Sequence, residues 1–254
     1  RNLSRRMGYT VTFAPKITTG KAGSGLHIHM RLNDPATGRN MMLDERRHIS
    51  DDARRAIAGM MTMARSITAF GNTNPTSYFR LVPNQEAPTN ICWGDRNRSV
   101  LVRVPLGWTA DTDMCAAANP GSHASAAPVE GKQTVEIRSA DGSADVYLLI
   151  ASLAVACRHG WEMEHALEKA ADTYVDVDIH RPENAGRLAS LDHLPASCAE
   201  SADALLADRA VYESRGVFPP AVIDSTAAAL KKFAGTDTSE KSMSDLVRRF
   251  LHSC

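Results

Sequence analysis

The sequence predicts an α+β fold in which a mainly antiparallel sheet is flanked by helices and the C-terminal region is helical. Two patterns support this prediction. Short runs alternate apolar and polar residues, as half-buried strands do, and they span residues 26–32, 99–105 and 133–141. Longer runs place apolar residues three and four positions apart, as amphipathic helices do, and they span residues 51–70, 144–171, 221–233 and 239–252.

The composition is that of an ordinary globular chain, with 43% hydrophobic and 23% charged residues among 254. Lys plus Arg equal Asp plus Glu at 29 each, so no overall field would draw the chain to nucleic acid or to a membrane surface. Any anion site must therefore be local. The five cysteines lack CxxC spacing, and the chain has neither an N-terminal signal nor a long apolar run, which together predict a cytoplasmic protein with reduced thiols.

The length suits one large domain or two small ones with a substantial core. The chain begins RNLSRRMGYT without an initiator methionine, so we expect it to be part of a longer polypeptide. Residues 106–131 are rich in Ala, Gly, Ser and Pro and lack a sustained period. They predict a long loop, and loops of such length commonly act as lids or contact surfaces.

The N-terminal part predicts two strands joined by a glycine-rich turn. Residues 7–16 alternate well enough for a strand, and the turn after them offers backbone N–H groups to an anion. In the run at residues 26–32, His27 and His29 share one face. Both rings project the same way about 7 Å apart, which suits a metal or a phosphate. A pair of solvent-facing histidines is the alternative.

The helix at residues 51–70 begins after Ser50, a residue type that favours the N-cap position. The helix carries methionines at core spacing, which predict packing and no catalytic part.

Residues 74–105 gather an unusual density of arginines on a stretch that four prolines stiffen. Arginine stays protonated and offers a planar fork of donors, so Arg80, Arg98 and Arg103 suit phosphate or carboxylate binding. Glu86 can act as a general base, and nearby guanidinium groups favour its ionised form. The alternative is an arginine-rich surface whose exposed ion pairs contribute little.

The run at residues 133–141 places Glu136 and Arg138 on the polar face of a strand, with Thr134 beside them. A carboxylate and a guanidinium thus share one face, as the two histidines do. A structural cross-strand ion pair is the alternative to a functional role.

Four ordered blocks of this sequence closely resemble the catalytic core of the glutamine synthetase family. They are GSGLHIH at 23–29, NPTSYFRLVPNQEAP at 74–88, RNRSVLVRVP at 96–105 and TVEIRSADGSADVYL at 134–148. Any one block would be weak evidence, whereas four in the family's order are highly specific. The resemblance implies that residues 1–254 form a partial glutamine synthetase/guanido kinase-like catalytic domain, with ATP/ADP and Mg²⁺ or Mn²⁺ as cofactors. The family usually has a shorter connection at residues 106–131, so this segment resembles an inserted loop.

The resemblance also implies roles for residues that match the family's metal and nucleotide sites. His27 and Glu136 match two ligands of the metal nearer the ATP phosphates. His29 and Arg103 match contacts to the phosphates, and Arg98 matches the arginine that stabilises the transferring phosphoryl group.

For the amino-acid substrate, the resemblance implies that Arg80 and Arg138 hold glutamate carboxylates and that Gly23 makes a backbone contact. Glu86 matches the flap glutamate that closes the site and accepts a proton during amide formation. Ala22 departs from the asparagine usual in the family, and a small N-terminal domain and an upstream ExE metal-binding strand have no counterpart in this sequence.

We therefore expect an ATP-dependent ligase that forms a γ-glutamyl amide from glutamate and ammonia through an acyl phosphate. One alternative is a γ-glutamyl ligase that uses an organic amine or polyamine as acceptor. Another is a catalytically silent oligomeric homologue. The resemblance further implies a homo-oligomer, most often of twelve subunits, with small-molecule substrates and no nucleic-acid or membrane partner.

Overall fold

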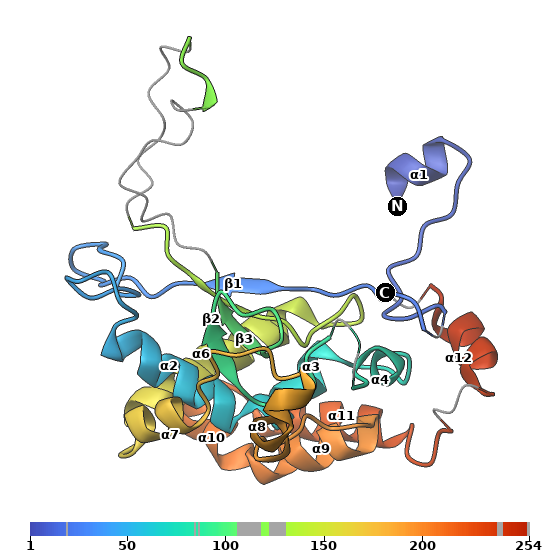
Figure 1. The fold of residues 1–254 in the computed structure, drawn as a ribbon. Coiled ribbons are helices and arrows are strands. Elements are labelled where there is room, and N and C mark those ends of the chain that lie inside the picture. The colour runs from blue at the N-terminus through green and yellow to red at the C-terminus, as the bar shows by residue number, and fades with distance from the viewer. Residues whose placement is uncertain are drawn as a thin grey trace.

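The computed structural model, shown in Figure 1, describes residues 1–18, 20–83, 85, 87–105, 118–121, 131–237 and 241–252. Most of the expected inserted loop, residues 106–117 and 122–130, lies outside the described residues. Glu86 lies outside them as well.

The strands form one four-stranded sheet in the order β1 (Ile28–Met30), β4 (Val135–Ile137), β3 (Val102–Val104) and β2 (Trp93–Asp95). β4 pairs antiparallel with both β1 and β3, whereas β2 and β3 run parallel. The sheet is therefore mixed, and the expectation of a mainly antiparallel sheet was too specific. The implied likeness to guanido kinases stays a prediction.

The register of the sheet gathers the polar side chains on one face. Glu136 in the central strand β4 lies directly opposite His29 in β1 and Arg103 in β3. Their neighbours Ile137 and Val102 point to the other face and belong to the main hydrophobic core. The alternation seen in the sequence is confirmed here, because side chains in a strand alternate between faces.

The predicted strand at residues 7–16 is wrong. This segment forms no regular strand, and Tyr9 and Phe13 lie largely exposed on it. Alternation predicts which side chains share a face, but a strand also needs a neighbour to bond its backbone, and no ladder partner for this segment lies among the described residues. Its end is nevertheless anchored, because Lys16 is buried and donates to the Gln85 side chain at 2.6 Å.

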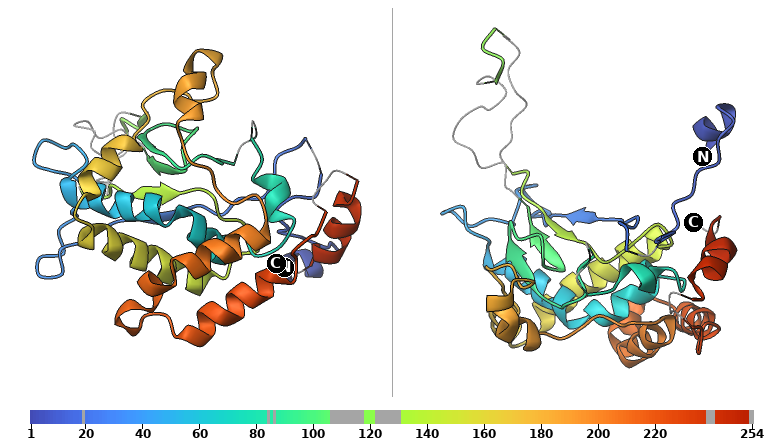
Figure 2. Two further views of the ribbon diagram at one scale, coloured as in Figure 1. Left: turned by 90° about the horizontal axis from the view of Figure 1, so that it is seen from below. Right: turned by 45° about the vertical axis from the view of Figure 1, so that its right-hand side comes forward.

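The two long predicted helices are each divided in two. The first becomes α2 (Asp51–Thr62) and α3 (Ala64–Gly71), and the second becomes α6 (Val146–Glu162) and α7 (Ala166–Asp172). The N-caps follow the sequence, since Ser50 accepts from Ala53 N at 3.1 Å and Asp145 accepts from Leu148 N at 3.0 Å. Helices α2, α3 and α6 lie beneath the sheet and form the core with it (Figures 1 and 2).

The C-terminal region is helical, as predicted. It contains α9 (Cys198–Ala207), α10 (Arg209–Glu213), α11 (Pro220–Lys231) and α12 (Met243–Phe250), and α9 packs along α11 (Figure 2). Short elements complete the described part: α1 (Asn2–Arg6), α4 (Ser77–Arg80), α8 (Ala185–Ala189), η1 (Pro182–Asn184) and η2 (Ser214–Gly216). None of the helices in the described ranges combines the length and apolar character needed to cross a bilayer.

The crossing of α2 and α6 is unusually close because glycines meet there. A Cβ atom on Gly59 would lie 1.9 Å from Ala156 O, and one on Gly160 would lie 1.9 Å from Arg55 O. Backbone atoms cannot yield as the end of a flexible side chain can. The two glycines therefore set the distance between the helices that carry the sheet.

We predict that Gly59→Ala lowers the free energy of unfolding by about 3 kcal/mol or more, because the added methyl group forces the two helices apart. Gly186→Ala is the matched control, since Gly186 lies in α8 and a Cβ atom added to it would meet nothing within 4 Å. It should leave stability unchanged or raise it by up to about 1 kcal/mol. Chemical denaturation of both variants measures the difference, and equal stabilities would contradict the close crossing.

Candidate active site

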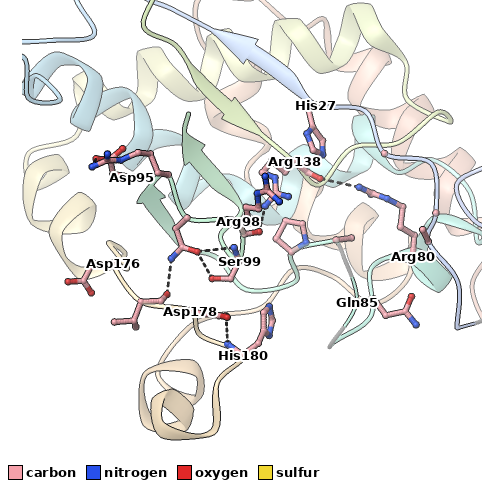
Figure 3. Close-up of a pocket in the computed structure, with 18 of the residues that line it drawn as sticks. His27, Arg80, Gln85, Asp95, Arg98, Ser99, Arg138, Asp176, Asp178 and His180 are labelled. Carbon is pink, nitrogen blue, oxygen red and sulfur yellow. Dashed lines mark hydrogen bonds and ion pairs between the residues drawn. The ribbon is translucent and has the colours of Figure 1, made fainter. Parts of the chain in front are cut away.

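A cavity of about 880 Å³ opens between the glycine-rich turn, α4, the loop from β2 to β3 and residues 176–180 (Figure 3). Five residues that the sequence singled out line it: Gly23, His27, Arg80, Arg98 and Arg138. Segments distant along the chain thus meet at one cavity, as a binding site requires.

Glu136 is the electrostatic centre beside this cavity, and its side chain is only 1% exposed. Its Oε2 lies 2.8 Å from His29 Nε2, and its Oε1 lies 2.9 Å from Arg103 Nε and 3.3 Å from Arg138 Nε. His27 Nδ1 lies 3.9 Å from the same Oε1. The sheet register explains the cluster, because His29 and Arg103 flank Glu136 on the two neighbouring strands. Arg138 follows Glu136 by two residues, just past the end of β4.

The cluster shifts the protonation of its members. Burial lowers the pKa of His27, and the positive charge of Arg138 lowers it further, while Glu136 opposes both. Burial also lowers the pKa of Arg138, against the attraction of Glu136. His27 is therefore favoured in its neutral form, in which a ring nitrogen can bind a metal or accept a hydrogen bond.

The predicted metal ligands only partly fit a metal ion. His27 Nδ1 and Glu136 Oε1 are suitable donor types, and the buried Oε1 accepts no hydrogen bond from the residues that the structure describes. Two arginines face that same oxygen, however, and the described residues contain no group of three or more His, Cys, Asp or Glu side chains that could hold a metal. These residues alone do not complete a metal site.

Arg80 and Arg138 build the wall of the cavity. Arg80 is 6% exposed, and it donates to Ser139 O at 2.7 Å and to Arg138 O at 3.2 Å. Arg138 donates to Arg98 O and to Val100 O. Both guanidinium groups thus hold backbone carbonyls in addition to lining the cavity, a structural part that the sequence did not reveal.

The glycine-rich turn packs directly over Arg80. A Cβ atom on Gly25 would lie 2.6 Å from Arg80 Nη2, and one on Gly23 would lie 2.5 Å from Pro15 O. Any larger residue at either position would displace the turn from the arginine. The glycines of this block therefore allow the turn to pack closely against Arg80 and Pro15.

Arg98 is exposed on the loop between β2 and β3 and points toward the cavity (Figure 3). Asn97 fixes that loop, since its Oδ1 accepts from Ser99 N at 2.9 Å and its Nδ2 donates to Val177 O at 2.8 Å. In the described part of the chain no ion-pair partner faces the Arg98 guanidinium. Arg98 is thus the arginine of this wall best placed to meet an incoming anion.

The structure adds an acidic wall that the sequence reasoning missed. Asp95, Asp176 and Asp178 line the cavity together with His180 (Figure 3). The signal was the alternating run VDVDIH at 175–180, in which buried Val175 and Ile179 fix the orientation of the acidic residues between them. It lies outside the four recognised blocks.

The predicted site residues are therefore gathered, with one exception. His29, Arg103 and Glu136 are not among the residues that line the cavity. Glu136 connects them to it, because it lies within ion-pair distance of His27 and Arg138, which do line it. Glu86 lies outside the described residues, although its neighbours Gln85 and Ala87 line the cavity.

We predict that Glu136→Gln lowers the free energy of unfolding by about 3 kcal/mol, because it leaves two partly buried arginines without their counter-charge. Glu162→Gln is the matched control, since Glu162 pairs with Arg158 and Arg215 but is 38% exposed. It should cost no more than about 1 kcal/mol. Denaturant titration compares the two, and equal costs would show that Glu136 does not organise the cluster.

Three comparisons with known proteins bear on this site. Residues 1–245 match the family model described as glutamine synthetase, catalytic domain. Over 229 residues the chain is 33% identical to a glutamine synthetase of Streptomyces filamentosus and 34% identical to one of Mycobacterium tuberculosis, covering 89% of this chain and 43% and 42% of those proteins. The chain thus spans less than half the length of these relatives.

Two solved structures share the fold. One is described as a novel glutamine synthase homolog, with a TM-score of 0.71 and 22% identity over 100% of this chain and 51% of that one. The other is ligand-free GmaS, with a TM-score of 0.63 and 26% identity over 91% and 45% of the two chains. The likenesses to solved structures concern the fold, and the family match over residues 1–245 shows that the chain belongs to the glutamine synthetase family, whose members are carbon–nitrogen ligases.

Proposed function

We propose that this chain carries the catalytic domain of an ATP-dependent ligase that forms a γ-glutamyl amide from glutamate and ammonia through an acyl phosphate. The convergence of His29, Arg103 and Arg138 on Glu136, beside a cavity also lined by Arg98, supports this proposal most directly. As in the family generally, ATP and Mg²⁺ or Mn²⁺ are the proposed cofactors. Completing the metal sites would need ligands beyond those described.

The reaction explains why such a cavity needs fixed cations. A carboxylate is a poor electrophile at neutral pH, so it must first accept a phosphoryl group. Negative charge spreads over the oxygens of that group during transfer, and preorganised cations stabilise it. We assign this part to Arg98, with Arg103 and His29 contacting the other phosphates.

The glutamate substrate would bind at the turn end of the cavity. We assign its carboxylates to Arg80 and Arg138, and a backbone contact to Gly23. These assignments are supported by the place of all three residues in the cavity lining. Glu86 is the proposed base that removes a proton from the amine as the amide forms.

The acidic wall favours a second candidate, a ligase with an organic amine or polyamine as acceptor. Asp95, Asp176 and Asp178 give one side of the cavity negative charge, which suits an extended cation better than a single small one. Comparing phosphate release with ammonium and with 1,4-diaminobutane separates the two: the higher kcat/KM names the acceptor. A silent oligomeric homologue would turn over neither.

The assembly is inferred from the family resemblance and the location from the cysteine usage, and both are proposals. We propose a homo-oligomer, in the family's usual form a dodecamer, acting on small molecules in the cytoplasm. Cys92, Cys157 and Cys198 are free thiols, which accords with a reducing compartment.

We predict that Arg98→Ala in the complete polypeptide lowers glutamate-dependent phosphate release by at least about a thousandfold. The Kd for ATP should rise by less than about tenfold, because an arginine that stabilises the transferring phosphoryl group acts mainly in the transition state. Arg39→Ala, an exposed arginine in a turn outside the cavity, is the control and should change neither quantity. Equal losses of turnover and affinity would show that Arg98 only binds the nucleotide.

A further inference from the structure

A second cavity, of about 700 Å³, lies where the start of α2, helix α7 and strand β2 meet. Its lining differs from that of the candidate active site except at the turn of Asp95 and Arg96, which borders both. No step of the proposed reaction uses it. Its volume lies within the range of about 300 to 1,000 Å³ that small-molecule sites occupy.

The floor of this second cavity is aromatic and held in place. The rings of Trp93 and Tyr174 meet edge to face with their centroids 4.8 Å apart. The Trp93 indole N–H donates to Ala170 O at 2.6 Å, so the ring orientation is fixed. Aliphatic side chains extend the apolar lining: Leu43, Ile49, Val104 and Leu167. A planar apolar group suits such a floor, because aromatic rings gain both burial and favourable edge-to-face contact there.

The rim of the cavity is charged, with a positive excess. Three arginines and two aspartates line it: Arg47, Arg54, Arg96, Asp51 and Asp95. The pairs Arg54 with Asp51 and Arg96 with Asp95 both have N–O distances of 3.5 Å between exposed groups, too long for strong hydrogen bonds. Such loose pairs contribute little, so a ligand can compete for these guanidinium groups.

Arg54 and Arg96 line the same cavity as Trp93 and Tyr174. Burial raises the pKa of the Tyr174 hydroxyl, as do Asp95 and Asp176, while Arg96 and Arg54 lower it. A guanidinium group presents paired donors that match the two oxygens of a carboxylate. The cavity thus combines an apolar lining with guanidinium groups that can bind a carboxylate.

We propose that this second cavity binds a planar aromatic monocarboxylate, with its ring on Trp93 and Tyr174 and its carboxylate at Arg54 and Arg96. The proposal does not rest on the ligase reaction, although Asp95 and Arg96 border both cavities. Arg54 is the residue to test, because it lines this cavity and not the candidate active site.

The test is a calorimetric titration of the complete polypeptide with naphthalene-2-carboxylate and with its neutral isostere 2-naphthamide. We expect saturable binding of the carboxylate, at least about tenfold weaker binding of the amide, and a similar loss for Arg54→Ala, as expected for one charge-assisted contact. Arg55→Ala is the matched control, since Arg55 is the next residue of α2 and lies outside the cavity lining. It should bind the carboxylate as the unchanged protein does.

A second variant keeps the test decisive if Arg54→Ala fails to fold. Ala171 lies exposed on α7 at the cavity wall, so Ala171→Trp should fill the cavity without disturbing the core and abolish binding. The proposal is overturned by the absence of saturable binding, by equal affinities for carboxylate and amide, or by variants at Arg54 and Ala171 that bind normally. Heat of binding is read without turnover, so a failed ligase assay and a failed titration remain distinguishable.

Discussion

The described structure depends on one buried carboxylate. Glu136 sits in the central strand with its side chain almost fully enclosed, and three cationic or protonatable partners, His29, Arg103 and Arg138, converge on it from the sheet around it. Without the charge between them, the guanidinium groups of Arg103 and Arg138 would repel each other. The sheet register thereby fixes the polar face, and the polar face sets the shape of one wall of the cavity.

That constraint extends from the sheet to the loops. Arg138 holds the carbonyl groups of Arg98 and Val100, and Arg80 holds those of Arg138 and Ser139. The arginines therefore act as braces as well as charges, and the loop that carries Arg98 is held at the cavity by the same contacts. A site whose cations are fixed in advance loses little free energy to reorganisation when an anion arrives.

The sequence predicted the parts of this structure that depend on side-chain period and cap chemistry. Alternation placed Glu136 on the polar face of its strand, and Ser50 marked the start of α2. Alternation does not specify strand direction or partner, which is why the parallel pairing of β2 with β3 and the irregular segment 7–16 escaped it. The acidic wall was missed because its orientation depends on where residues 175–180 pack, a tertiary feature.

The central claim is that the cationic wall supports phosphoryl transfer from ATP to a glutamate carboxylate. Positional isotope exchange tests it most directly, with ATP labelled by ¹⁸O at the bridge between its β- and γ-phosphorus atoms and with no acceptor amine present. If the complete polypeptide forms an acyl phosphate reversibly, glutamate will make the label scramble into the non-bridging positions of the β-phosphate. Scrambling that does not require glutamate, or none with ATP and glutamate bound, would contradict the account.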